Sequence, residues 1–250
     1  TVAGETGRIT LTGPGQAYFQ QVFDAALGRN VNRLALINTT LATRLVVDTN
    51  QNRLTDFRIV SNDGASIGSA SIRANLLGDS NFYFDGYVQF IEFGGLDMIG
   101  TIGAGNDMGT VVIGQVTRGF IDANHIQSII VGGDLGLRTQ NGEAGIRLLS
   151  GGSIQIFGND FGLISVLRNL SSVNVSGAID RAAIRAGRSL DSVTAAALNE
   201  SRISVRNNLG SVNITGNVTD SLIYAGADLG ADGAFGTAGG NAINADVISN

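Results

Sequence analysis

Short runs of alternating apolar and polar residues recur along the second half of the chain. Three of them, Leu170–Gly177, Leu190–Ala197 and Leu209–Gly216, align almost residue for residue, and each is followed by a second short apolar run. Alternation with a period of two is typical of a β-strand that buries one face. The spacing of 19 or 20 residues between these runs leaves room only for two strands and their turns.

Residues of one kind recur at the same place in each repeat. The first apolar residue of each main strand forms a column with steps of 18, 25, 19, 20 and 19 residues: Val111, Ile129, Ile154, Val173, Val193 and Val212. A hydroxyl column comes just before it: Thr110, Ser128, Ser153, Ser172, Ser192 and Ser211. A mostly apolar column lies two residues earlier: Met108, Ile126, Gly151, Leu170, Leu190 and Leu209. A small residue follows five residues after the hydroxyl: Gly133, Gly158, Gly177, Ala197 and Gly216. The longest step indicates an insertion around Gly133–Gly145.

A pair of such short strands cannot bury its apolar face alone, but stacked coils share one continuous core. The pattern therefore predicts an all-β fold, a parallel β-helix (β-solenoid) with about 19–20 residues per coil. Right-handed winding is the default for parallel crossovers. The regular repeats are expected over residues 97–250, with a Gly-rich insertion at about 226–240 and a final partial coil at Ala242–Ala245.

The first part of the chain, residues 1–96, repeats less regularly and is expected to form irregular coils. Residues 16–28 have an amphipathic pattern that ends at Gly28, which predicts a short N-terminal helix capping the open end of the solenoid. Further strands are expected at Leu34–Ile37, Leu45–Val47, Phe57–Val60, Ser71–Ala74 and Phe82–Phe84.

The ends of an open solenoid expose unpaired strand edges, which invite pairing with another chain. We therefore expect a homo-oligomer that assembles through the solenoid ends or by strand addition. Gly7–Thr12 is a candidate for a free strand that adds to the edge of a neighbour. The C-terminal residues Asn241–Asn250 have a strand-like pattern and no predicted cap.

The composition narrows the function classes. Hydrophobic residues make up 43% of the chain and charged residues 15%, so it is too apolar to be disordered. The formal net charge is −5 and every basic residue is Arg, which argues against nucleic-acid binding. No run of about 18 apolar residues is present, so no membrane span is expected. The chain contains no Cys, which excludes disulfides and thiolate metal sites. It begins at Thr1, and we expect a processed mature chain or a segment of a longer protein.

The repeats resemble a known class of proteins. Leu209-Gly-Ser-Val-Asn-Ile-Thr-Gly216 and the residues that follow, as far as Gly236, are similar to the β-helical repeats of very large bacterial extracellular proteins of planctomycete type. The resemblance covers about Asp97–Asn250 and is carried by the repeat architecture. It implies an extracellular or cell-surface location and a structural, adhesive or surface-layer role.

Several residues are candidates for metal binding or catalysis. Turns of the form Asp-apolar-Gly recur, and their carboxylates are the candidate calcium ligands: Asp107, Asp134, Asp160 and Asp228. The alternative is that they only shape turns. The single histidine, His125, lies between two coils and is interpreted as a turn residue. No cofactor other than calcium is expected.

Two groups of residues are candidate binding surfaces. The aromatic cluster Phe82, Tyr83, Phe84, Tyr87, Phe90 and Phe93 forms either core packing or a contact surface. Arginines are dense between Arg168 and Arg206, with Asp180, Asp191 and Glu200 among them. They form either a solvated mixed-charge face or a groove for an acidic polysaccharide.

The sequence therefore favours an extracellular structural protein, a self-assembling subunit of a filament, fibre or surface layer. An adhesin or glycan-binding segment of a giant surface protein is the alternative. A polysaccharide-active enzyme is less favoured, because the strands carry no paired carboxylates. We expect no enzymatic activity.

Overall fold

The chain forms one long stack of β-strands. The computed structural model describes residues 7–25, 28–61, 64–139, 143–229 and 246–248. The strands are β1 (Gly7–Thr12), β2 (Gln16–Asp24), β3 (Arg29–Ile37), β4 (Arg44–Thr55), β5 (Phe57–Ser61), β6 (Ile67–Gly78), β7 (Asn81–Phe84), β8 (Val88–Ala104), β9 (Met108–Ile113), β10 (Val116–Val131), β11 (Ala144–Ile156), β12 (Leu163–Val166), β13 (Leu170–Asp180), β14 (Ala183–Ala186), β15 (Ser189–Asn199), β16 (Arg202–Val205), β17 (Asn208–Ile214), β18 (Val218–Thr219), β19 (Leu222–Ala225), β20 (Ala227–Leu229) and β21 (Asp246–Ile248).

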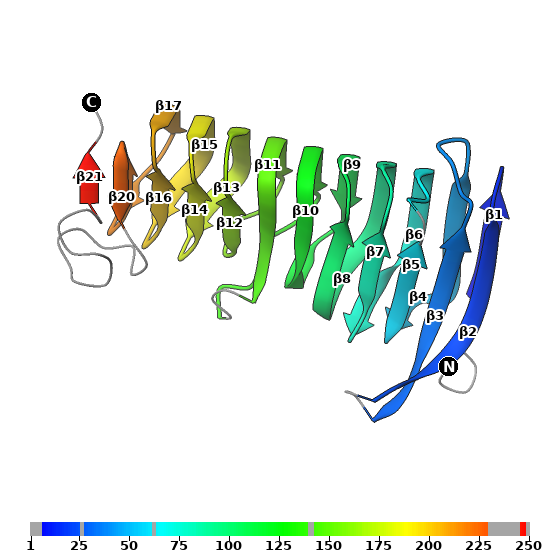
Figure 1. Cartoon of the computed structure of the whole chain (residues 1–250). Coiled ribbons are helices and arrows are strands. Elements are labelled where there is room, and N and C mark those ends of the chain that lie inside the picture. Colours follow the sequence, from blue (N-terminus) through cyan, green and yellow to red (C-terminus); the bar gives the residue numbers. More distant parts are fainter. Residues whose placement is uncertain (1–6, 26–27, 62–63, 140–142, 230–245, 249–250) are drawn as a thin grey trace.

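The stack is a parallel β-solenoid of about eight turns, as the repeats predict (Figure 1). The predicted columns are confirmed by the strand register: Ser128 pairs with both Thr110 and Ser153, and the hydroxyl column continues through Ser172 and Ser192 to Ser211. The strands expected in the first hundred residues are also present, within β3, β4, β5, β6 and β7.

Each coil has three faces rather than the two that the sequence suggested. One face contains the main strands, with Val111 and Ile129 paired in its inward column. A second contains the short strands, with Ile164 paired to Ile184. The third is narrow between β10 and β13, where single bridges connect Val116, Leu135, Asp160 and Ile179. Aliphatic residues from all three faces form one buried core that runs along the solenoid.

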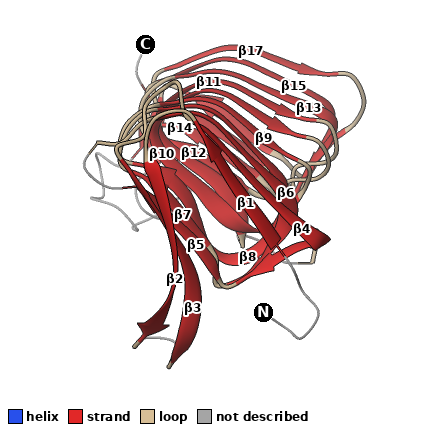
Figure 2. Ribbon diagram, turned by 90° about the vertical axis from the view of Figure 1, so that its right-hand side faces the viewer, coloured by secondary structure: helices blue, strands red, loops and turns tan. Residues whose placement is uncertain are grey.

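The predicted N-terminal capping helix is wrong. Residues 16–24 form β2, which pairs antiparallel with β3 from Gln16↔Ile37 to Asp24↔Arg29. Tyr18, Phe19 and Phe23 favour strands, and the backbone edge of β3 offers a partner for every residue of β2. This long-range pairing outweighs the helical spacing of the apolar residues. The antiparallel hairpin extends away from the body of the stack in both views (Figures 1 and 2).

The candidate free strand is also paired within the chain. β1 lies antiparallel to β4, with Leu11 opposite Leu45, so only its outer edge is open in the described structure. At the other end of the chain, β20 and β21 pair antiparallel instead of adding a parallel coil. The expected partial coil at Ala242–Ala245 and most of the Gly-rich insertion lie outside the described residues.

The column of small residues has one shift. Gly158 stacks between Gly133 and Gly177 through backbone hydrogen bonds of 3.0 and 2.9 Å. Ala197 pairs with Ala178, one residue beyond Gly177, because a β-bulge in β13 shifts the register there. The boundary expected at residues 96 and 97 falls inside β8, and the stacked columns pass through it. In the described part of the chain, no helix qualifies as a candidate membrane span.

Candidate functional site

The N-terminal end of the solenoid is covered by two antiparallel strands that leave a gap between them. β1 pairs with β4 and β2 pairs with β3, and no described strand pairs with the outer edge of either. Ile9 and Leu11 of β1 and Ala17 of β2 pack against the core but are only partly buried. The first layer of the core is therefore incompletely covered.

A hollow of about 520 Å³ lies at this end. Its apolar lining comes from β1, β2 and β3: Ile9, Leu11, Ala17, Phe19 and Leu34. Phe19 is 56% exposed, whereas Leu34, its partner on β3, is 1% exposed. This end of the core therefore presents an aromatic ring to solvent beside a buried aliphatic layer.

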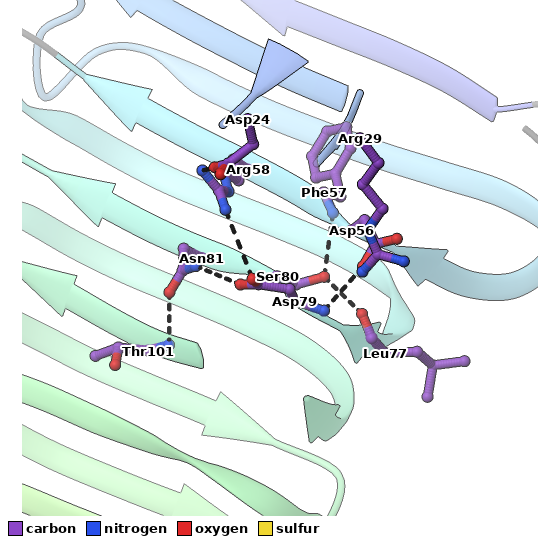
Figure 3. A network of polar contacts seen from close by, with 10 residues as sticks. All are labelled: Asp24, Arg29, Asp56, Phe57, Arg58, Leu77, Asp79, Ser80, Asn81 and Thr101. Carbon is purple, nitrogen blue, oxygen red and sulfur yellow. Dashed lines mark hydrogen bonds and ion pairs between the residues drawn. The ribbon is translucent and has the colours of Figure 1, made fainter. Parts of the chain in front are cut away.

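A network of ion pairs fixes the hairpin to the coils beside it (Figure 3). Arg58 of β5 bonds Asp24 at the end of β2, with 2.5 Å between Nη1 and Oδ2, and its Nη2 lies 3.7 Å from Asp79. Arg29 at the start of β3 bonds Asp56 at 2.8 Å, and Asp56 also accepts a hydrogen bond from the amide of Asp79. These contacts thus connect both strands of the hairpin, β2 and β3, to the next turns of the solenoid.

The last regular coil at the C-terminal side also presents apolar residues. β17 and β18 pair with β15, and β19 pairs with β16, and no described strand adds to their outer edges. Val218 is 54%, Leu222 51% and Ile223 42% exposed. The equivalent inward residue one coil earlier, Ile203, is fully buried. Ile223 is more exposed than Ile203 because no described strand pairs with the outer edge of β19.

The candidate calcium ligands lie apart from one another. Asp107 is exposed before β9, and Asp134 accepts hydrogen bonds from the backbone and side chain of Asn159 at 2.6 and 3.2 Å. Asp228 lies in β20, and its side chain is outside the described structure. Among the described residues, no three His, Asp or Glu side chains gather where a metal ion could bind. The carboxylates of Asp134 and Asp160 have structural contacts, and calcium binding stays a prediction.

Asp160 has the most unusual surroundings of the four. It pairs with Leu135 and Ile179 in an inward column and is fully buried. Its Oδ1 accepts a hydrogen bond of 2.9 Å from the amide of Gly162, and its Oδ2 has no partner. Burial raises the pKa of Asp160 to about 7, against the smaller opposing effect of the Gly162 bond. The Asp-apolar-Gly motif gave no sign of this, because a one-residue shift of register separates Asp134 from Asp160.

The remaining sequence candidates are mostly structural. His125 lies within β10, so its interpretation as a turn residue is wrong, and its Nδ1 lies 2.9 Å from Ser150 Oγ in the next coil. In the aromatic cluster, Phe82, Phe84 and Phe93 are buried, and Phe82 meets Phe93 edge-on with centroids 5.3 Å apart. Tyr87 and Phe90 are half-buried, and Tyr83 points outward and is 46% exposed.

The fold places the chain in the class of parallel β-solenoids, with antiparallel strands at the N-terminal end. No protein-family model, curated protein or solved structure matches it.

Proposed function

We propose that the chain is a structural subunit that assembles end to end, the N-terminal hollow of one copy receiving the last regular coil of the next. The observation that carries this proposal is the matched exposure of core layers at both ends, with Phe19 on one side and Ile223 on the other. In a coaxial stack, β17 and β19 of one copy run antiparallel to β1 and β2 of the next, so both open edges find partners.

The subunit is proposed to be wound right-handed and to act outside the cell, as a filament, fibre or surface layer. The location rests on the resemblance of its repeats to those of bacterial extracellular proteins. The proposal includes no catalytic step. In its outward column, Asp122 has Gly103 and Arg147 as neighbours rather than a second carboxylate.

A mixing experiment with two blocked variants tests the end-to-end contact. Phe19→Asp places a charge in the N-terminal hollow, and Ile223→Asp places one on the last coil. Each variant alone has one intact end and is expected to stay monomeric, near 25.8 kDa, in light scattering after size exclusion. Mixed, they are expected to form a 1:1 dimer that grows no further, because both of its outer ends are blocked.

Other outcomes overturn the proposal in distinct ways. If Ile223→Asp alone dimerises, the contact is isologous through the N-terminal ends. If the unmodified chain stays monomeric up to high concentration, the ends do not associate. Thermal unfolding of each variant verifies that the solenoid is intact.

A further inference from the structure

A groove crosses the outer surface of the face built by the short strands. It has a volume of about 650 Å³ and lies over β7, β8, β10, β11 and β12. The outward residues of these strands form one row along the solenoid axis: Tyr83, Gly103, Asp122, Arg147 and Ser165. Because neighbouring strands lie about 4.8 Å apart, the row spans roughly 20 Å.

Tyr83 provides a flat surface at one end of the groove. Its ring packs on the next coil: a Cβ at Gly103 would be in ordinary contact with it, 3.8 Å from Tyr83 Cδ2, and one at Gly105 would lie only 2.7 Å from its hydroxyl. The side chain is still 46% exposed. A tyrosine ring that is held by the next coil and remains half exposed is a surface on which a pyranose ring can stack.

Arg147 is held in place near the middle of the groove. Its guanidinium carbon lies 3.6 Å from the centroid of the Phe120 ring, and that ring in turn covers Gly145. Among the described residues, Arg147 makes no hydrogen bond or ion pair. Asp122, its neighbour in the row, also makes no hydrogen bond or ion pair among the described residues. The negative charge of Asp122 and the positive charge of Arg147 offset each other. The donors of a fixed guanidinium are thus free for a ligand.

Arginines continue beyond the groove in the same direction. The row proceeds from Ser165 to Arg185, two coils after Arg147. Arg168 and Arg188 occupy equivalent positions at the adjacent corner of successive coils, where the amide of Arg188 donates a hydrogen bond of 3.0 Å to the carbonyl of Arg168. All three side chains are exposed, and in the described structure none has an ion-pair partner. By contrast, Arg181 on another corner is paired with Glu200 at 3.2 Å.

We propose that this row binds an acidic polysaccharide laid along the solenoid axis. One sugar ring stacks on Tyr83, and carboxylate or sulfate groups of the polymer pair with Arg147, Arg185 and the two corner arginines. The advance of one coil is close to the length of one sugar unit, so an extended polymer keeps in step with the arginines at every second coil. Four arginines against the single carboxylate of Asp122, on a chain of net charge −5, favour a polyanion over a neutral glycan. The site lies on the side of the solenoid, so it does not depend on end-to-end assembly.

Binding of polygalacturonate and heparin, with neutral dextran as comparison, tests this site by calorimetry or biolayer interferometry. We expect the two acidic polymers to bind, with affinity falling as salt rises, and dextran not to bind. The double variant Arg147→Gln/Arg185→Gln is expected to lower the affinity about tenfold or more. The control Arg73→Gln/Arg118→Gln makes the same change in net charge at arginines that already have carboxylate partners, and it should bind nearly as well as the unmodified chain.

Variants of Tyr83 separate stacking from general attraction. Tyr83→Ala is expected to weaken binding about fivefold, and Tyr83→Phe to restore it, since the ring and not the hydroxyl carries the contact. Equal losses in the two arginine double variants would overturn the site and leave only non-specific attraction. Single-stranded DNA binding as tightly as the polysaccharides would overturn the assignment of the ligand. Monomeric end-blocked variants should bind normally, which keeps this result independent of assembly.

Discussion

Phe19 stacks on Phe57 with ring centroids 6.4 Å apart and planes inclined by 22°. The ring centroid of Phe57 lies 6.0 Å from that of Phe82, which is deeper in the core. Phe57 is 3% exposed, whereas Phe19 is 56% exposed. The aromatic contacts therefore run from the interior of the solenoid to its open N-terminal end and stop at an uncovered ring. Aromatic packing of the kind that joins Phe57 to Phe82 is therefore available at Phe19 for another molecule.

Replacing Phe19 should affect association more than folding. In Phe19→Asp, the exposed half of the ring is lost from the proposed interface, and a charge would have to be buried against the partner. We expect self-association to be abolished while the free energy of unfolding falls by only about 1 kcal/mol, because the side chain is already half in water. Phe157→Asp is the matched control, since Phe157 is 54% exposed on the side of the solenoid. Loss of association in both variants would show that the effect is not specific to the end.

Asp160 should make the stability of the solenoid depend on pH. Its pKa is about 7 in the folded chain and near 3.8 when exposed, so between these values the folded state keeps a proton that the unfolded state has lost. Its contribution to stability is therefore complete below about pH 4 and is lost as the pH rises through 7. The difference between these two pKa values corresponds to a change in the free energy of unfolding on the order of 4 kcal/mol.

Urea unfolding of Asp160→Leu between pH 4 and 8 measures this contribution. Leucine suits the inward column between Leu135 and Ile179 and cannot ionise. We expect the variant to be more stable than the unmodified chain at pH 8, and the advantage to shrink toward pH 4. A constant difference across this range would show that Asp160 does not change its ionisation.

Gly114 should be hard to replace because another coil passes close to it. A Cβ at this position would lie 1.9 Å from the carbonyl oxygen of Gly94 in the coil before. We expect Gly114→Ala to lower the free energy of unfolding by about 2 kcal/mol or more, since one coil would have to shift. Gly7→Ala meets its nearest atom at 3.4 Å and should have little effect. Similar midpoints for the two variants in chemical unfolding would contradict this close packing.

Arg58 should control the position of the N-terminal hairpin. Its guanidinium joins Asp24 to Asp79, and the side chain is only 25% exposed. Arg58→Gln removes both ion pairs, so amide hydrogen exchange in β2 is expected to become faster while exchange in β13 and β15 is unchanged. Arg73→Gln, which breaks a more exposed ion pair with Asp48, is the control. Unchanged exchange in β2 would mean that backbone pairing alone fixes the hairpin.

The sequence predicted the stacking of the coils well, even across an insertion. Ser128 and Ser153 could be matched across an insertion because both precede an alternating apolar strand, and in the structure their hydroxyl oxygens lie 3.3 Å apart. The third face could not be predicted, because Leu135 joins it through isolated bridges rather than a strand. β2 was missed because pairing with β3 decides its conformation, and a helical spacing of apolar residues carries no information about that partner.

The candidate sites were harder to predict than the fold. The hollow joins residues of β1, β2 and β3, and the groove joins Tyr83 of β7 to Arg147 of β11. Asp160 has an Asp-apolar-Gly motif like that of Asp134, yet the register places it in the core. Such features depend on which residues meet across coils, and a motif within one coil does not specify this.

Electron microscopy of the purified chain, with its mass measured in the same sample, tests end-to-end assembly most directly. In the proposed stack each subunit adds ten strand layers on the main face: β1, β4, β6, β8, β9, β10, β11, β13, β15 and β17. At about 4.8 Å per layer, this gives an axial length of about 48 Å per subunit. The account predicts filaments or lattices with an axial repeat near that length, built from chains of 25.8 kDa and absent from Phe19→Asp. Dispersed monomers at high concentration, or filaments that persist in Phe19→Asp, would contradict it.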